Sequence, residues 1–316
     1  MNLVSFVKRR PWIWSFVATI VVFVVTVMFT GGASFTGLTQ AALTFAAFSV
    51  IVGLGQMFVI TLGPGNIDLS IPATMTLAGT VALKFMDVQN AFIFPGLLVA
   101  IGIGIGIGLG NYALIKALRI PPIIATLSTS FIIQSTAIWT NRGLRIRPPQ
   151  PLADFAVGMS FGIPNMAIVA FLLAILAWFL LERTLYGRWV SAIGQNMRAA
   201  RLAGIPVDGI RCLTYILCAV LASVGGYLLA SFSGGAALNM GAEYLLMSIA
   251  VVVIGGSAVA GGDSNVPGIW GASLFMFLVV TMLNTYGFDA AYRLILTGLI
   301  IIGVIVVAGG RDLIRK

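Results

Sequence analysis

The sequence predicts an all-α polytopic membrane protein of about ten transmembrane helices, a class defined by long apolar segments. Of its 316 residues, 59% are hydrophobic and only 9% are charged, and the mean hydropathy is +1.07. Soluble domains carry roughly 25% charged residues. The apolar residues also form continuous runs near the roughly 20 residues that a helix needs to cross a bilayer. A β-barrel is excluded, because its strands would alternate apolar and polar residues.

The runs define the expected spans in chain order. These are residues 12–30, 41–62, 73–86, 92–115, 121–140, 166–181, 207–230, 243–260, 269–286 and 291–309. Glycine, proline and charged residues separate them, as expected at helix ends. Trp12 and Trp14 would anchor the first span at the membrane interface. The second is rich in small residues, so we expect it to lie centrally in the bundle.

Glycine occupies every second position from Gly102 to Gly110 in the fourth span. Alternation with isoleucine could indicate a strand, but an isolated strand cannot cross a bilayer. We therefore expect a helix that packs closely on several sides. Gly102, Gly106 and Gly110 form a small-residue ladder suited to a neighbouring helix.

Basic residues predict the orientation. The net charge of +9 comes from short basic segments between apolar runs, which indicates topology and lipid contact rather than nucleic-acid binding. If the N- and C-termini are cytoplasmic, most of these basic segments lie on the cytoplasmic side of the membrane. The segments on that side are Lys8–Arg10, Lys116 with Arg119, the 182–206 segment and the C-terminal tail. The loop with Arg142, Arg145 and Arg147 is the exception.

Several kinds of chemistry are missing from the sequence. There is no histidine, and no glycine is followed by lysine, so the chain has no P-loop. No acid–base or nucleophile constellation is apparent. We expect a transport subunit rather than an enzyme, with no metal and no cofactor on this chain.

The segment Gly63–Pro72 interrupts the apolar sequence with Asn66, Asp68 and Ser70. Proline and glycine break helices, and freed backbone groups at membrane depth need protein or a watery cavity to satisfy them. An acid there usually has a partner or a task. One interpretation is therefore a part of a solute path. The other is a short solvated turn in which Asp68 or Ser70 caps the next helix.

A second break at 231–242 follows the seventh span, as the first follows the second span. Such paired breaks suggest two inverted halves of about five helices each, with the solute path between them. Polar candidates for this path are Gln56, Asn66, Asp68, Ser70, Asn239 and Asn284. For each intramembrane amide, an interhelical hydrogen bond is the simpler alternative.

The 182–206 segment is the longest charged stretch. It predicts a short amphipathic helix, Met197 to Ala203, which Asn196 would cap and Gly204 would stop. This helix could lie at the lipid interface through Arg198 and Arg201, or dock into a soluble partner.

Three motifs then carry a family resemblance. They are Asn66-Ile67-Asp68-Leu69-Ser70; Gly194-Gln195-Asn196 followed by Ala199-Ala200 and Ala203-Gly204-Ile205; and Ile249-Ala250, Val253-Ile254-Gly255-Gly256, Gly261-Gly262, Pro267-Gly268 and Asn284. Together they resemble the inner-membrane permease subunit of ribose/galactose/xylose-class ATP-binding-cassette sugar importers, in the branched-chain amino-acid/ribose permease superfamily. Asn66 stands where that family usually has glycine.

The resemblance implies one permease domain over residues 1–316, in the bacterial inner membrane, that moves a sugar or sugar-like solute. It implies a separate P-loop ATPase that binds ATP and Mg²⁺, a second permease copy or paralogue, and a periplasmic binding protein. The segment 182–206 would couple to the ATPase; its contacts would be Asn196, Arg198, Ala199, Ala200 and Gly204. The alternatives are a nucleoside or branched-chain amino-acid permease of the same plan, or a secondary transporter that uses Asp68.

Overall fold

The computed structural model describes residues 12–29, 35–141 and 147–285, with isolated positions between 289 and 303. These residues are mostly helical. In chain order the elements are α2 (Ile13–Phe29), α3 (Phe35–Thr61), α4 (Ile71–Met86), η1 (Asn90–Phe92), α5 (Ile93–Leu118), α6 (Pro122–Asn141), α7 (Gln150–Val157), β1 (Met159–Ser160), β2 (Ile163–Pro164), α8 (Asn165–Arg183), α9 (Leu185–Gln195), α10 (Met197–Leu202), α11 (Val207–Phe232), α12 (Tyr244–Ile254) and α13 (Val266–Thr285).

A helix overlaps each predicted span from the first to 269–286, so the all-α polytopic prediction is confirmed. Within the described ranges, six helices are long and apolar enough to cross a membrane, and three apolar helices are shorter. The tenth predicted span, 291–309, falls largely on residues that the structure does not describe, and the same holds for Arg142 and Arg145. The expected count of about ten helices therefore stays a prediction.

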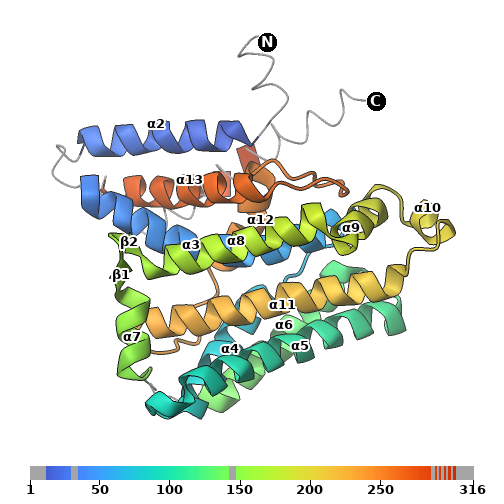
Figure 1. The fold of residues 1–316 in the computed structure, drawn as a ribbon, viewed down its shortest axis with the longest axis horizontal. Coiled ribbons are helices and arrows are strands. Elements are labelled where there is room, and N and C mark those ends of the chain that lie inside the picture. The colour runs from blue at the N-terminus through green and yellow to red at the C-terminus, as the bar shows by residue number, and fades with distance from the viewer. Residues whose placement is uncertain are drawn as a thin grey trace, which may run out of the picture.

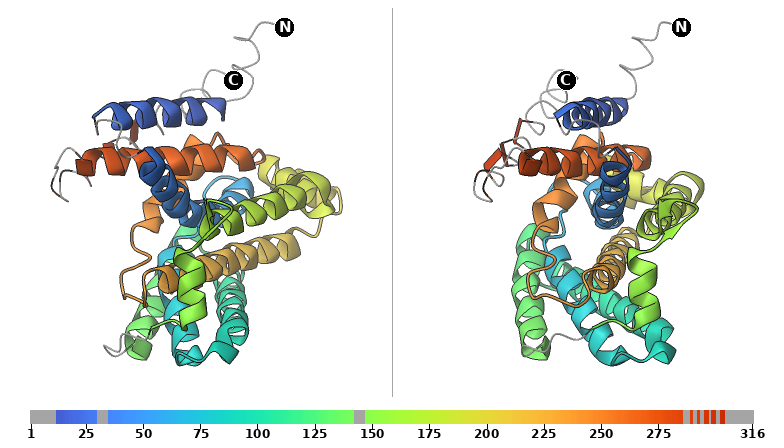
Figure 2. Two further views of the ribbon diagram at one scale, coloured as in Figure 1. Left: turned by 60° about the vertical axis from the view of Figure 1, so that its left-hand side comes forward. Right: turned by 90° about the vertical axis from the view of Figure 1, so that its left-hand side faces the viewer.

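Most of the long helices run side by side along one direction, with α9 and α10 at one end of the bundle (Figure 1). The short helix α7 and the two-stranded β1–β2 hairpin lie at the opposite end (Figure 1). α2 lies at the periphery, where it packs on α13 (Figure 2). α11 packs against α3, α4 and α5 and so occupies the interior. The prediction that the second span is central is also confirmed, because α3 is buried continuously from Ala46 to Thr61.

Two predicted boundaries are wrong. The expected loop 141–165 contains α7 and the β1–β2 hairpin, because Leu152 and Ala156 give α7 a buried apolar side. The expected span 243–260 ends early, at Ile254. Gly256 has a φ of +87°, which stops the helix, and Gly255 packs directly against the backbone of Gly268.

Within the described residues, the glycine ladder predicted at Gly102, Gly106 and Gly110 meets no neighbouring helix. A Cβ added at any of these three positions would meet nothing within 4 Å. The intervening Gly104 and Gly108 are buried instead, and a Cβ on Gly108 would lie 2.4 Å from the Ile216 Cα of α11. A period of two places glycine on opposite faces of a helix, so only one set meets the neighbour.

Candidate translocation path and coupling surface

The break between α3 and α4 is a folded, mostly buried turn. Pro64 and Gly65 are exposed at its tip, whereas Asn66, Asp68 and Ser70 are buried. The solvated-turn interpretation is therefore wrong for the polar residues. Ser70 occupies the N-cap position of α4, but its side chain does not cap the helix.

Asp68 is the centre of a polar cluster inside the bundle, with only 1% of its surface exposed. Its Oδ1 accepts hydrogen bonds from the backbone N–H of Ser70 at 2.8 Å and from the Ser70 hydroxyl at 2.6 Å. Its own backbone N–H donates to Gln56 Oε1 of α3 at 3.2 Å. Asn111 of α5 donates to the Ser70 hydroxyl at 2.8 Å. Residues of α3, of the break and of α5 thus meet at Asp68 and Ser70.

The cluster keeps unused hydrogen-bonding capacity. Gln56 Nε2, Asp68 Oδ2 and Asn111 Oδ1 are buried and have no hydrogen-bond partner among the described residues. Buried polar atoms without partners are rare and costly, and they mark places where water or another polar group can bind. The Cys218 thiol of α11 also interacts with the carboxyl group of Asp68.

Asn66 joins the same break to α11. Its side-chain oxygen accepts from Arg211 Nη2 and from the Tyr215 hydroxyl, each at 3.2 Å. Its side-chain nitrogen donates to the Gly63 carbonyl at 3.1 Å. Both hydrogen bonds that the Asn66 amide oxygen accepts thus come from α11, from residues 145 and 149 positions further along the chain.

The structure does not gather the other two predicted path residues with this cluster. Asn239 is exposed in the turn segment between α11 and α12, and Asn284 is exposed near the end of α13. The prediction that they line the path stays a prediction. Sequence reasoning missed Asn111 and Arg211, although each is a polar residue inside a predicted span, which is itself a signal of function.

The second break nevertheless lies against the first. A Cβ on Gly241 would come 2.2 Å from the carbonyl oxygen of Pro72, at the start of α4. The side chain of Gln134 in α6 also donates to the Leu238 carbonyl at 2.7 Å. The two interrupted segments therefore meet, as paired breaks would, but the inverted relation of the halves stays a prediction.

The predicted short helix in the 182–206 segment is confirmed as α10. Asn196 caps it, since its side-chain oxygen accepts from the N–H groups of Arg198 and Ala199, each at 3.0 Å. Gly204 stops it with a φ of +82°, and the Ile205 N–H returns to the Ala200 carbonyl at 3.1 Å. This is the left-handed ending that favours glycine.

α10 presents a small exposed surface. Arg198 and Ala199 point outward, whereas Ala200 is 5% exposed and holds the helix on the rest of the protein. Leu202 is 91% exposed, which sequence reasoning missed. A lone, fully exposed leucine is ordinary at a surface, but here it ends a short helix that projects from the bundle (Figure 1).

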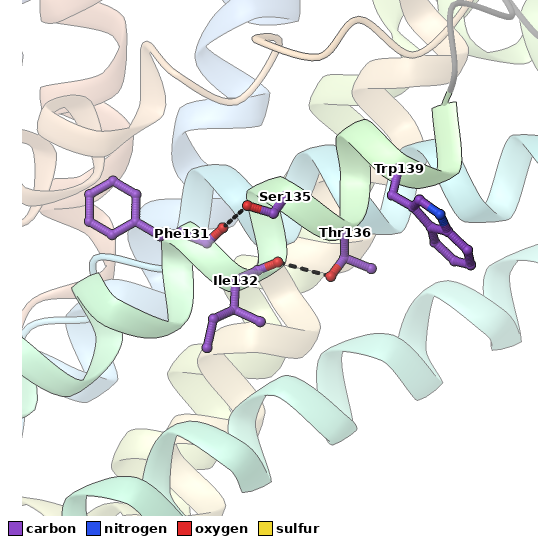
Figure 3. A pocket seen from close by; sticks show the side chains of 5 residues that line it. All are labelled: Phe131, Ile132, Ser135, Thr136 and Trp139. Carbon is purple, nitrogen blue, oxygen red and sulfur yellow. Dashed lines mark hydrogen bonds between the residues drawn. The ribbon is translucent and has the colours of Figure 1, made fainter.

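A surface pocket of about 450 Å³ belongs neither to the polar cluster around Asp68 nor to the surface of α10. It is lined by five residues of α6, namely Phe131, Ile132, Ser135, Thr136 and Trp139 (Figure 3). The two hydroxyl groups are already bonded to carbonyl groups of their own helix (Figure 3). The aromatic side chains are exposed and apolar, as expected of a helix that faces lipid.

Comparison with known proteins gives a consistent picture. The family model described as "Branched-chain amino acid transport system / permease component" matches residues 38–305. The ribose import permease protein of Bacillus subtilis (strain 168) is 30% identical over 306 residues, which cover 93% of this chain and 90% of that protein. The galactofuranose transporter permease protein of Escherichia coli (strain K12) is 32% identical, with 84% and 78% covered. No solved structure matches the chain.

Proposed function

The chain belongs to the family of branched-chain amino acid transport system permease components, and we propose that it is the membrane-spanning permease subunit of an ATP-binding-cassette importer for a sugar or sugar-like solute. The family match carries this proposal, because residues 38–305 include both the buried break and the coupling segment. The relatives named above are a ribose import permease and a galactofuranose transporter permease, and they do not favour a nucleoside, amino-acid or secondary transporter.

The proposed assembly has further subunits. A separate P-loop ATPase binds ATP and Mg²⁺ and supplies the energy, and this chain holds no cofactor. A second permease copy or paralogue completes the path, and a periplasmic binding protein delivers the solute. The chain is a single permease domain over residues 1–316 in a bacterial inner membrane, with both termini in the cytoplasm. The distribution of basic residues supports this orientation.

The proposed solute path passes the polar cluster at the break. Its residues are Gln56, Asn66, Asp68 and Ser70, together with Asn239 and Asn284 near the second break and the end of α13. The unsatisfied atoms of Gln56 and Asp68 support this placement, because hydroxyl groups of water or of a sugar can bond to both. Few polar side chains are needed if the binding protein, rather than the permease, selects the solute.

The proposed contact with the ATPase is made by α10 and its flanks. Asn196, Arg198, Ala199 and Gly204 belong to the exposed surface, and the buried Ala200 seats the helix. We add Leu202, whose side chain would enter a groove on the ATPase. Full burial of a leucine contributes about 1.5–3 kcal/mol, which corresponds to roughly a ten- to hundredfold change in affinity.

Affinity purification of the tagged chain from native membranes in mild detergent tests this function. We expect a stoichiometric P-loop ATPase in the mass spectrum, and its loss in Leu202→Glu or in Gly204→Pro. Val157→Glu is the matched control, because Val157 is also an exposed apolar residue but lies at the opposite end of the bundle. A stable permease without any ATPase in several mild detergents would refute the proposal.

A further inference from the structure

We infer that Arg211 is a positioning residue that ties the buried break between α3 and α4 to the coupling segment, so that movement of that segment reaches the polar cluster around Asp68. This inference rests on the proposed function, since it needs an ATPase that moves α9 and α10. The structure supports it through two contacts, one at the start of the break and one in its middle.

The first contact is at the start of the break and leaves no room for a side chain. A Cβ on Gly194 of α9 would lie 1.9 Å from the Thr61 carbonyl oxygen and 2.4 Å from the Gly262 nitrogen. The Gly262 N–H also donates to the Thr61 carbonyl at 2.9 Å. Backbone touches backbone here without a flexible side chain between them. A shift of α9 must therefore displace the end of α3.

The second contact is Arg211 itself. α11 begins at Val207, immediately after the coupling segment, and Arg211 lies about one helical turn further on. Its Nη2 donates to Asn66 Oδ1 at 3.2 Å, and its guanidinium lies over the Tyr112 ring at 5.8 Å. The start of α11 is thus bonded to a side chain in the middle of the break.

The charge of Arg211 is unusually weakly compensated. Across the described ranges, no carboxylate oxygen lies within the 4.0 Å ion-pair distance of its guanidinium, and its buried Nε has no partner. The nearby Asp208 instead pairs with Lys116 at 3.3 Å and accepts from Tyr112 at 2.9 Å. An arginine at the edge of an apolar bundle, with an amide as its main hydrogen-bond partner, lowers the stability of the fold. Such a residue is therefore expected to have a function.

The link from Asn66 to the cluster is short and stiff. Asn66 and Asp68 are separated by one residue, and both are held by hydrogen bonds in a buried turn. α11 touches this turn again at Cys218, about 10 Å along the helix from Arg211. A rotation or translation of α11 would therefore move the whole turn, a rigid-body mode of switching.

Cys218 provides a natural reporter, because its side chain is buried beside Asp68. The complex of this chain with its co-purified ATPase would be reconstituted in liposomes and treated with N-ethylmaleimide. Labelling of Cys218 would be followed by site-resolved mass spectrometry, with Mg-ATP alone or with orthovanadate to trap the ATPase. We expect trapping to change the labelling rate about fivefold or more, the lower end of typical coupling between sites.

The variants decide the role of Arg211. In Arg211→Gln and in Asn66→Gly we expect the vanadate effect to fall below about twofold, while the amount of co-purified ATPase is unchanged. The double variant should resemble either single variant, because both remove one contact. Arg211→Lys, which can still donate to Asn66, should restore part of the effect. Arg147→Gln, at an exposed arginine near α7, should leave it intact.

The outcomes separate this inference from the proposed function. A purified chain without any ATPase would overturn the proposed function itself. With the ATPase present, a vanadate effect that persists in Arg211→Gln would overturn the inference, and so would its absence from the unmodified complex. If Arg211→Gln does not assemble, Tyr215→Phe removes the other donor to Asn66 Oδ1 and should weaken the effect. An undiminished effect in Tyr215→Phe would then overturn the inference.

Discussion

Replacement of Gly108 by alanine should destabilise the bundle, even though alanine is the better helix former. Gly108 lies on the face of α5 that packs on α11, and an added Cβ would be 2.4 Å from the Ile216 Cα and 2.7 Å from the Tyr215 carbonyl oxygen. Ordinary contact begins at 3.4 Å, so the shortfall is 3.4 − 2.4 = 1.0 Å. Both neighbours are backbone atoms, which cannot rotate away. The two helices must therefore separate.

The magnitude follows from two opposing effects. Overpacking of a close interface costs about 1–3 kcal/mol. Exchange of glycine for alanine inside a helix returns about 0.8–1.0 kcal/mol of helix propensity. The difference between these two effects is a net loss of up to about 2 kcal/mol.

Gly106→Ala is the matched control, two residues away in the same helix. Its added Cβ would meet nothing within 4 Å, so only the propensity gain remains. Thermal denaturation in detergent, followed by size-exclusion chromatography with fluorescence detection, compares the two variants directly. We expect a lower melting temperature for Gly108→Ala and an unchanged or higher one for Gly106→Ala. Equal melting temperatures, or the reverse order, would refute the packing of α5 on α11 described above.

Three further predictions concern the break and the coupling segment. Asp68→Asn should keep the turn, because the amide oxygen can still accept hydrogen bonds from Ser70. Asp68→Ala should cost roughly 1–3 kcal/mol for each Ser70 donor that loses its acceptor. Comparable melting temperatures for the two variants would contradict this. Asn196→Ala should remove about 1 kcal/mol of helix stabilisation by the N-cap and should speed hydrogen exchange of the α10 amides. Asn196→Asp should do neither, because aspartate also caps helices. Unchanged exchange in the alanine variant would contradict the role of Asn196 as a cap. Gly194→Ala should abolish accumulation of the folded protein in membranes, because its Cβ would collide with the Thr61 carbonyl oxygen; a normal yield of monodisperse protein would contradict that close contact.

The buried cluster could be predicted in part. Gln56, Asp68 and Ser70 were identified because polar residues are conspicuous in an apolar sequence, and the structure brings them together. Asn111 is equally conspicuous, but nothing local indicates that it donates to Ser70, 41 residues away. Asn239 was identified in the same way, but it is exposed and lies outside this cluster, so its part in the path stays a prediction.

The sequence by itself determined the class of the protein, the positions of most helices and the ends of α10. These follow from local physics, because a segment in lipid must satisfy its backbone internally, and because Asn196 and Gly204 act within one turn. The tertiary structure decided which glycines of α5 meet α11, and that Arg211 bonds to Asn66 across 145 residues of chain. Those choices depend on how helices distant in sequence are rotated against each other, which no single helix encodes.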